Sequence, residues 1–302
     1  MWCLALFSMS MVAIAEESRL DKIKSAKGPG SYAITGLERG GNVSFGGYFD
    51  TEYSYGKNNS GQTESVFDNH HMIIEMAAQL HPDLLFNTEI EYEHAGGTIK
   101  IEQAWIDYRF SDAFVQRMGV VVVPFGRVNV LHDSDVREMT DRSLYARHIV
   151  PTTWSDTAIG AYGYFELNDF EINYEGYVMN GLSSTITANN GLRSARNLQE
   201  DDNNVNKAIV GRVGVSPFLG LELGTSGYYG AYSDDGEQKI KMLGFDGLWK
   251  WNSFEFIAEY ASVKLDVLAS QATVIPEEMY GYYLEARYNT APQFLKNVLG
   301  KF

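Results

Sequence analysis

The sequence predicts an all-β protein, specifically a transmembrane antiparallel β-barrel. The 302 residues include 19 tyrosines, 16 phenylalanines and 29 glycines but only 7 prolines. This composition favours strands and tight turns over helices. Apolar and polar residues alternate over stretches of about 10 to 12 residues, the length that crosses a bilayer at a barrel's tilt. The apolar faces end in Tyr, Phe and Trp, which is typical of the aromatic girdles of outer-membrane barrels.

The alternation begins at Val43 and is clearest in the third expected strand. There, Phe86 and Ile90 face the side opposite Glu89 and Glu91. Turn residues such as Trp251-Asn252 and the Gly- and Asn-rich stretch after Tyr55 separate the strands. We expect about twelve strands, at residues 43–55, 71–79, 86–93, 103–110, 114–123, 157–167, 170–178, 206–215, 221–232, 238–249, 253–264 and 280–289.

A β-sandwich also alternates, but its outer face meets water and its loops are more even in length. Here short turns alternate with longer connections, as periplasmic turns and extracellular loops do in outer-membrane barrels. The faces opposite the aromatic ones are rich in carboxylates and could line water. The pattern therefore favours the barrel.

The ends of the chain suggest three parts. Residues 1–15 are apolar and close on Ala13-Ile14-Ala15, a small-x-small pattern typical of a secretory signal peptide, although no Lys or Arg precedes the apolar core. Residues 16–42 form a polar tail without an assignable role, and residues 43–302 form the barrel domain. Cys3 is the single cysteine and would leave with the signal, so no disulfide framework is expected.

The formal net charge is −15. Strong acidity argues against nucleic acid as a partner, because nucleic-acid recognition depends on neutralising phosphates with Lys and Arg. Mean hydropathy is −0.22, which does not exclude a barrel, since barrels place apolar residues at every second position.

The segment between Val123 and Thr157 interrupts the alternation. Pro124 ends an apolar strand because it has no N–H to donate, and no clean two-residue or helical period follows until Thr157. Long irregular segments inside a compact β protein are uncommon and usually functional. We therefore interpret residues 125–155 as a functional loop.

The motifs of this segment resemble one known family. Pro124-Phe-Gly-Arg127, His132-Asp133, Thr140-Asp-Arg142 and Val150-Pro-Thr-Thr-Trp-Ser-Asp156 look like the phosphate-selective porin O/P-like family of outer-membrane proteins. The resemblance implies a sixteen-stranded homotrimeric barrel in outer-membrane lipid, with the long loop narrowing the lumen. It also implies passive diffusion of small ions or solutes, including phosphate or other anions. Since the sequence supplies about twelve strands and residues 291–302 do not alternate, we expect an incomplete C-terminus.

Charged side chains of the loop are the candidate constriction, where mixed charges set selectivity. These are Arg127, His132, Asp133, Asp135, Arg137, Asp141, Arg142 and Arg147. Strand residues expected to line the lumen are Glu89, Glu91, Glu93, Asp107, Arg109 and Arg212. Arg and Lys ladders would favour phosphate, but Glu dominates the expected lumen faces of the strands. We therefore predict a general porin with a mild cation preference in place of a dedicated phosphate channel. We expect Phe125 and Trp154 to pin the loop to the wall.

The sequence predicts no catalytic site, no cofactor and no metal site. Asp133 and Asp135 are spaced as in an EF-hand loop, but Arg137 stands at the next ligand position. His70 and His71 are adjacent on a strand and are expected to face opposite sides. Gly224-Thr-Ser-Gly227 lacks the spacing of a nucleophile elbow. The alternative function is a soluble, exported all-β glycan-binding protein.

Overall fold

The computed structural model describes residues 42–58, 60–168, 170–197 and 202–289. The expected signal peptide (1–15), nearly all of the expected polar tail (16–42) and the terminal segment 291–302 lie outside these ranges.

The described chain forms one antiparallel sheet in which the strands follow one another in sequence order. The predicted all-β class and the predicted twelve strands are confirmed. The outer edges of β1 and β12 are not paired with each other, so the sheet is not closed within the described residues. The strands are β1 (Val43–Lys57), β2 (Thr63–His81), β3 (Leu84–Glu93), β4 (Thr98–Ser111), β5 (Phe114–Val122), β6 (Ser155–Leu167), β7 (Phe170–Met179), β8 (Ala208–Phe218), β9 (Leu221–Ala231), β10 (Lys239–Trp251), β11 (Phe254–Leu265) and β12 (Glu278–Tyr288).

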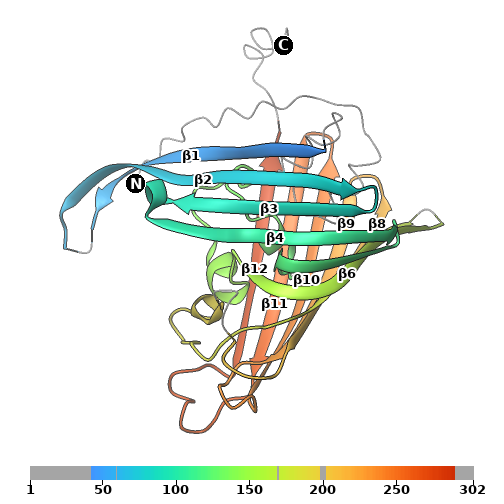
Figure 1. The fold of residues 1–302 in the computed structure, drawn as a ribbon. Helices are drawn as coiled ribbons and strands as arrows, with labels where there is room; N and C mark the ends of the chain where they lie inside the picture. The colour runs from blue at the N-terminus through green and yellow to red at the C-terminus, as the bar shows by residue number, and fades with distance from the viewer. Residues whose placement is uncertain (1–41, 59, 169, 198–201, 290–302) are drawn as a thin grey trace.

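The sheet is strongly curved and twisted (Figure 1). β1 to β4 run across the view, while β9 to β12 run steeply along it, so the sheet has a concave and a convex face. Right-handed strand twist accumulating over many neighbours produces this shape. Only short helical segments interrupt the loops, and no helix in the described ranges is long and apolar enough to cross a membrane. The short helical segments are η1 (His94–Gly96), α3 (Arg127–Val130), η2 (Tyr145–Ile149) and η3 (Arg193–Ala195).

Connections at the two ends of the strands differ in length, as the sequence predicts. One end has tight turns, for example at 252–253, where Asn252 adopts a left-handed φ of 53°. Asn tolerates this region because its short polar side chain relieves the strain. The other end carries the connections 123–154, 180–207 and 266–277. We call it the long-loop end.

The convex face is apolar and exposed, whereas much of the concave face is polar. On β3 the buried side chains are Asn87, Glu89 and Glu91, alternating with residues of the convex face. The same two-residue period holds on β12. Exposed apolar residues of the convex face include Phe45, Phe49, Ile106, Ile159, Ile209, Leu223, Leu243, Phe245, Tyr260, Tyr282 and Leu284.

One expectation about the strands is wrong. Asp50 pairs with His71 but Thr51 pairs with Asn69, so His70 is an extra residue on β2. Such a β-bulge breaks the alternation of side chains. His70 and His71 consequently face the same side, with ring centroids 4.0 Å apart.

Candidate functional site

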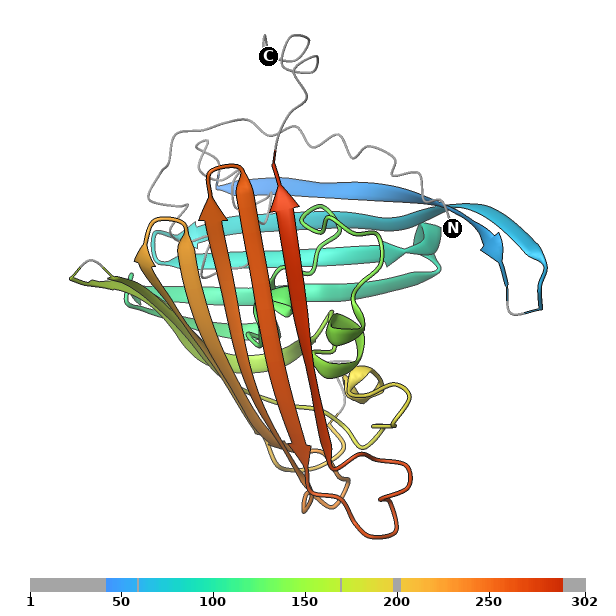
Figure 2. The same cartoon turned by 180° about the vertical axis from the view of Figure 1, so that it is seen from behind.

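The connection between β5 and β6 folds back into the concave face of the sheet (Figure 2). Its first turn crosses to strands far away in the sequence. The backbone N–H of Gly126 donates to Ser226 Oγ on β9 at 3.1 Å, and that of Val128 donates to Glu259 Oε1 on β11 at 2.5 Å. Long-range polar contacts thus fix the entry of the loop.

Glycine permits this close approach at two points. Gly126 has a φ of 70°, and a Cβ there would lie 2.9 Å from Glu259 Oε2. A Cβ on Gly244 of β10 would lie 3.1 Å from the Phe125 ring. The wall is therefore flat where Phe125 packs, and Phe125 is fully buried against it.

Asn129 joins the two ends of the loop. Its Nδ2 donates to the carbonyl oxygens of Val123 at 2.8 Å and Trp154 at 3.0 Å. Its Oδ1 accepts from the Trp154 backbone N–H at 2.9 Å. Both carbonyls also accept a backbone N–H, from Phe125 and Val123 respectively, whereas Asn129 is the acceptor for the Trp154 N–H. Because Asn129 is fully buried, this bond replaces water for that N–H.

His132 anchors the middle of the loop to the opposite wall. Its Nε2 lies 2.9 Å from Glu102 Oε1 on β4 and 3.5 Å from Asp133 Oδ1. Burial alone would lower the pKa of His132, but the two carboxylates outweigh it and raise the pKa to about 9. Burial raises the pKa of Asp133 to about 6, although His132 opposes this. The loop is thus held by a buried charged pair.

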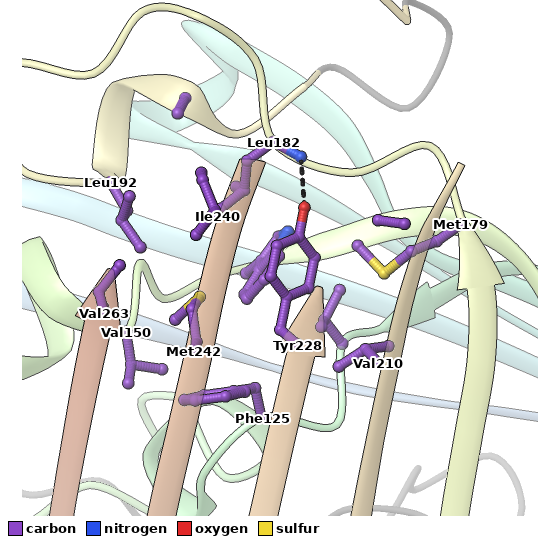
Figure 3. Packing of buried hydrophobic residues seen from close by; sticks show 14 of the residues in the cluster. Phe125, Val150, Met179, Leu182, Leu192, Val210, Tyr228, Ile240, Met242 and Val263 are labelled. Atoms are coloured by element: carbon purple, nitrogen blue, oxygen red, sulfur yellow. Dashed lines mark hydrogen bonds between the residues drawn. The ribbon is translucent and has the colours of Figure 1, made fainter. Parts of the chain in front are cut away.

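Apolar packing completes the anchoring (Figure 3). Phe125, Val150 and Trp154 pack with Met179, Val210, Tyr228, Ile240, Met242 and Val263 from the sheet. The β7–β8 connection joins the same cluster through Leu182, Ile186 and Leu192. Tyr228 Oη accepts a hydrogen bond from the Leu182 backbone N–H at 3.0 Å. Both long connections therefore cover the inner wall of β8 to β11, and Phe125 and Trp154 lie buried in this packing.

Arginines of the β5–β6 and β7–β8 connections lie close to one another. Arg193 donates to the Thr152 carbonyl at 2.6 Å, and Arg196 donates to the Thr153 carbonyl. Burial and then the guanidinium groups of Arg193 and Arg142 lower the pKa of Arg196 to about 10. Neighbouring cations, among them Arg142 and Arg147, also lower the pKa of Arg193 after burial. We call these four residues, Arg142, Arg147, Arg193 and Arg196, the arginine cluster.

A cavity of about 150 Å³ separates the loop from β11 and β12. The loop contributes Arg127, Arg137, Asp141 and Arg142 to its lining. The strands contribute Glu255, Glu259, Tyr283, Glu285 and Arg287. Cationic side chains of the loop therefore face carboxylates of the wall across the hollow.

Most wall residues predicted from the sequence are paired. Asp107 accepts from Arg117 at 2.7 Å, and Lys100 Nζ lies 2.7 Å from Glu91 and 3.0 Å from Glu93. Glu89 accepts a hydrogen bond from Gln103 at 2.7 Å.

The two predicted wall arginines have different surroundings. Arg212 donates to Asp246 at 3.0 Å and to Glu222 at 3.2 Å. Arg109 is exposed at the short-turn end of β4, where it pairs with Asp112. The predicted lumen set thus contains paired wall residues (Glu91, Glu93, Asp107 and Arg212), Glu89 with an amide partner, and the exposed terminal Arg109.

The predicted loop residues also separate into groups. Arg127 binds Glu222 at 2.8 Å, and Arg137 donates to the Thr140 carbonyl at 2.9 Å. Asp135 belongs to the same turn as Asp133, near Tyr48 of β1. Arg147 lies close enough to Arg193 of the β7–β8 connection to contribute to the lowering of its pKa. Functional partners that the sequence reasoning missed are Glu102, Arg193, Arg196, Glu222 and Glu259.

No family model matches the sequence. A protein of Aquifex aeolicus (strain VF5), described only as uncharacterized, is 30% identical over 293 residues. The match covers 88% of this chain and 65% of that protein, so the chain spans about two thirds of the relative's length.

Solved structures resemble the sheet. The anion-selective porin from Comamonas acidovorans matches with a TM-score of 0.55 at 10% identity, over 82% of this chain and 74% of that chain. The chain has a porin-type fold. Salmonella typhi OmpF, in complex with daunomycin, matches with a TM-score of 0.51 at 12% identity and the same two coverages, 82% and 74%. At these identities the likeness concerns the fold alone.

Proposed function

We propose that this protein is an outer-membrane porin, a water-filled channel for passive diffusion of small hydrophilic solutes and ions. The observation that carries this proposal is the position of the β5–β6 connection. It lies against the concave face of the sheet, much of which is polar, while the convex face is apolar. Residues 125–155 would form the constriction. An apolar convex face suits lipid, and a polar concave face suits water.

A channel in lipid requires closed strand edges, since an unpaired backbone edge is very costly there. We therefore infer that in the working channel β1 and β12 pair with further strands. The greater length of the Aquifex aeolicus relative is consistent with this. An outer-membrane location, a cleaved signal peptide over residues 1–15 and a homotrimer complete the proposal, in line with the sequence resemblance. No catalytic role is proposed.

The pairing of charges supports a preference for anions. Wall carboxylates that would attract cations, such as Asp107, Glu222 and Asp246, each lie within 4.0 Å of an arginine. In contrast, no carboxylate of the described chain lies within that distance of Arg142 or Arg147. Arg142, which lines the cavity, is therefore a cationic group of the proposed constriction that would attract anions. Phosphate and other small anions are the proposed solute class.

Reversal potentials in planar bilayers under a KCl gradient test this proposal. The wild-type channel should show anion preference, and the double variant Arg142→Gln, Arg147→Gln should shift the reversal potential toward cations. Arg109→Gln is the matched control, because Arg109 lies at the short-turn end, and it should leave the potential unchanged.

Cation preference in the wild type, or an equal shift in the control, would refute the assignment of selectivity to the arginine cluster. Recovery of the protein from the soluble periplasm in place of the membrane fraction would refute the channel and favour the exported glycan-binding alternative.

A further inference from the structure

The β-bulge on β2 creates a histidine cluster at the long-loop end that the channel proposal does not use. His70 is the extra residue of the bulge, and its Nδ1 lies 3.2 Å from Asp68 Oδ2. A regular strand would have turned His70 to the opposite face from His71. The bulge instead brings His70 to the polar face beside Asp68.

The turn between β3 and β4 supplies a second imidazole. His94 and Ala95 have φ values of 49° and 55°, in the left-handed region that non-glycine residues adopt infrequently. This conformation places the His94 ring 5.1 Å from that of His70. His94 Nδ1 lies 2.7 Å from Asp68 Oδ2, the same oxygen that contacts His70. Two imidazoles therefore converge on one carboxylate.

We propose that Asp68, His70 and His94 bind a divalent transition-metal ion, with Zn²⁺ as the best match and Cu²⁺ and Ni²⁺ as close analogues. Their ligand atoms all lie within 4.8 Å of one another. In a tetrahedral site with bonds of about 2.0–2.2 Å, ligand atoms lie about 3.3 Å apart, so small side-chain movements suffice. Two imidazoles and a carboxylate suit these metals better than Mg²⁺ or Ca²⁺.

The fourth position has a candidate ligand. Glu52 Oε2 on β1 lies 4.0 Å from His70 Nδ1. Either this carboxylate or water would complete the coordination. Metal binding would then connect β1, β2 and the β3–β4 turn, and it would place positive charge at the channel mouth.

Two other groups of potential ligands are less suited. Around His71, Glu91 and Glu93, the ammonium of Lys100 already lies 2.7 Å and 3.0 Å from the two carboxylates. In the Glu102–His132–Asp133 group, His132 is buried and fixes the loop.

Asp68 is in a different situation. Its side chain is 31% exposed, and within the described ranges it lies within 4.0 Å of the two histidines but of no Lys or Arg. Within the described part of the chain, Asp68 is thus both reachable from solvent and without a Lys or Arg in ion-pair distance.

The test is calorimetric titration of the untagged, refolded chain with Zn²⁺, together with electron paramagnetic resonance of the Cu²⁺ form. We expect one high-affinity ion for each chain and a Cu²⁺ spectrum with nitrogen coupling from two imidazoles. His94→Asn should weaken binding by at least about tenfold. Asn tolerates the left-handed φ, so the turn should be retained. His70→Asn should have the same effect.

His81→Asn is the matched control, since His81 is 64% exposed at the opposite end of β2 and lies 3.8 Å from a single carboxylate, Asp83. It should bind Zn²⁺ like the wild type. Unchanged affinity in His94→Asn, loss of binding in His71→Ala but not in His94→Asn, or no binding by folded wild-type protein would each overturn the proposal. The readout is independent of conductance, so failure of the channel proposal would not decide this one.

Discussion

Asn129 is the residue on which the closed base of the loop depends most. It donates to the Val123 and Trp154 carbonyls, which also accept backbone hydrogen bonds, and it is the acceptor for the buried Trp154 N–H. We expect Asn129→Ala to lower the free energy of unfolding by about 1–3 kcal/mol, because the buried Trp154 N–H would be left unsatisfied. Urea titration in detergent would measure this. A loss below about 0.5 kcal/mol would contradict the assigned role.

His132 makes the anchoring of the loop dependent on pH. Its folded-state pKa, about 9, lies above the ordinary value of 6.5. The stabilisation is therefore fully present below about pH 6.5 and is lost as the pH rises through about 9. The difference corresponds to on the order of 3 kcal/mol. Free energies of unfolding from pH 6 to 10 should show this decline.

The control for this prediction is His132→Gln, which cannot titrate. It should be less stable than the wild type at pH 6 and should lack most of the decline between pH 6.5 and 9. A decline of equal size in the variant would assign the pH dependence to other groups.

At the scale of elements, β10 provides a smooth surface for the loop. A side chain at Gly244 would collide with the Phe125 ring, whereas a Cβ at Gly227 on β9 would meet no atom within 4 Å. We expect Gly244→Val to destabilise the protein by about 1–3 kcal/mol through overpacking. Gly227→Val, the matched control, should be near neutral. Equal unfolding midpoints for the two variants in urea would contradict this packing.

The sequence was sufficient to predict the strands but not the contacts of the loop. Alternation over stretches such as 86–93 and 254–260 identifies strands because a half-buried sheet requires a two-residue period. The β5–β6 loop was predictable from its lack of any period. Its partners were not, since Glu259 and Glu102 look like any other inward carboxylate in the sequence. Their roles arise from contacts between residues far apart in the chain.

Two further features escaped sequence reasoning for physical reasons. The bulge at His70 adds one residue without any local signal such as Gly, and so the faces of His70 and His71 were assigned wrongly. The inward residues Tyr228, Ile240 and Met242 continue the expected alternation, but they form an apolar anchor for two loops in place of a polar wall. A two-residue period predicts which face of the sheet a residue lies on. It does not predict which part of the chain covers that face.

At the scale of the whole molecule, the convex face should behave as a lipid-facing surface. Leu243 is half exposed near the middle of β10, while Leu219 is almost fully exposed in the β8–β9 turn. In lipid vesicles we expect Leu243→Arg to lower the free energy of unfolding by about 2–4 kcal/mol and Leu219→Arg by about 0–1 kcal/mol, because the cost of Arg depends on depth. Equal costs would contradict a membrane-spanning sheet.

The central claim is that the β5–β6 loop narrows a water-filled channel. Single-channel conductance in planar bilayers tests it most directly, comparing the wild type with a variant in which a short Gly-Ser linker replaces residues 133–144. This variant keeps the anchors Phe125, Asn129, His132 and Trp154. We predict discrete conductance steps in the wild type and larger steps in the variant. Steps of equal size, or no steps from membrane-extracted wild-type protein, would contradict the claim.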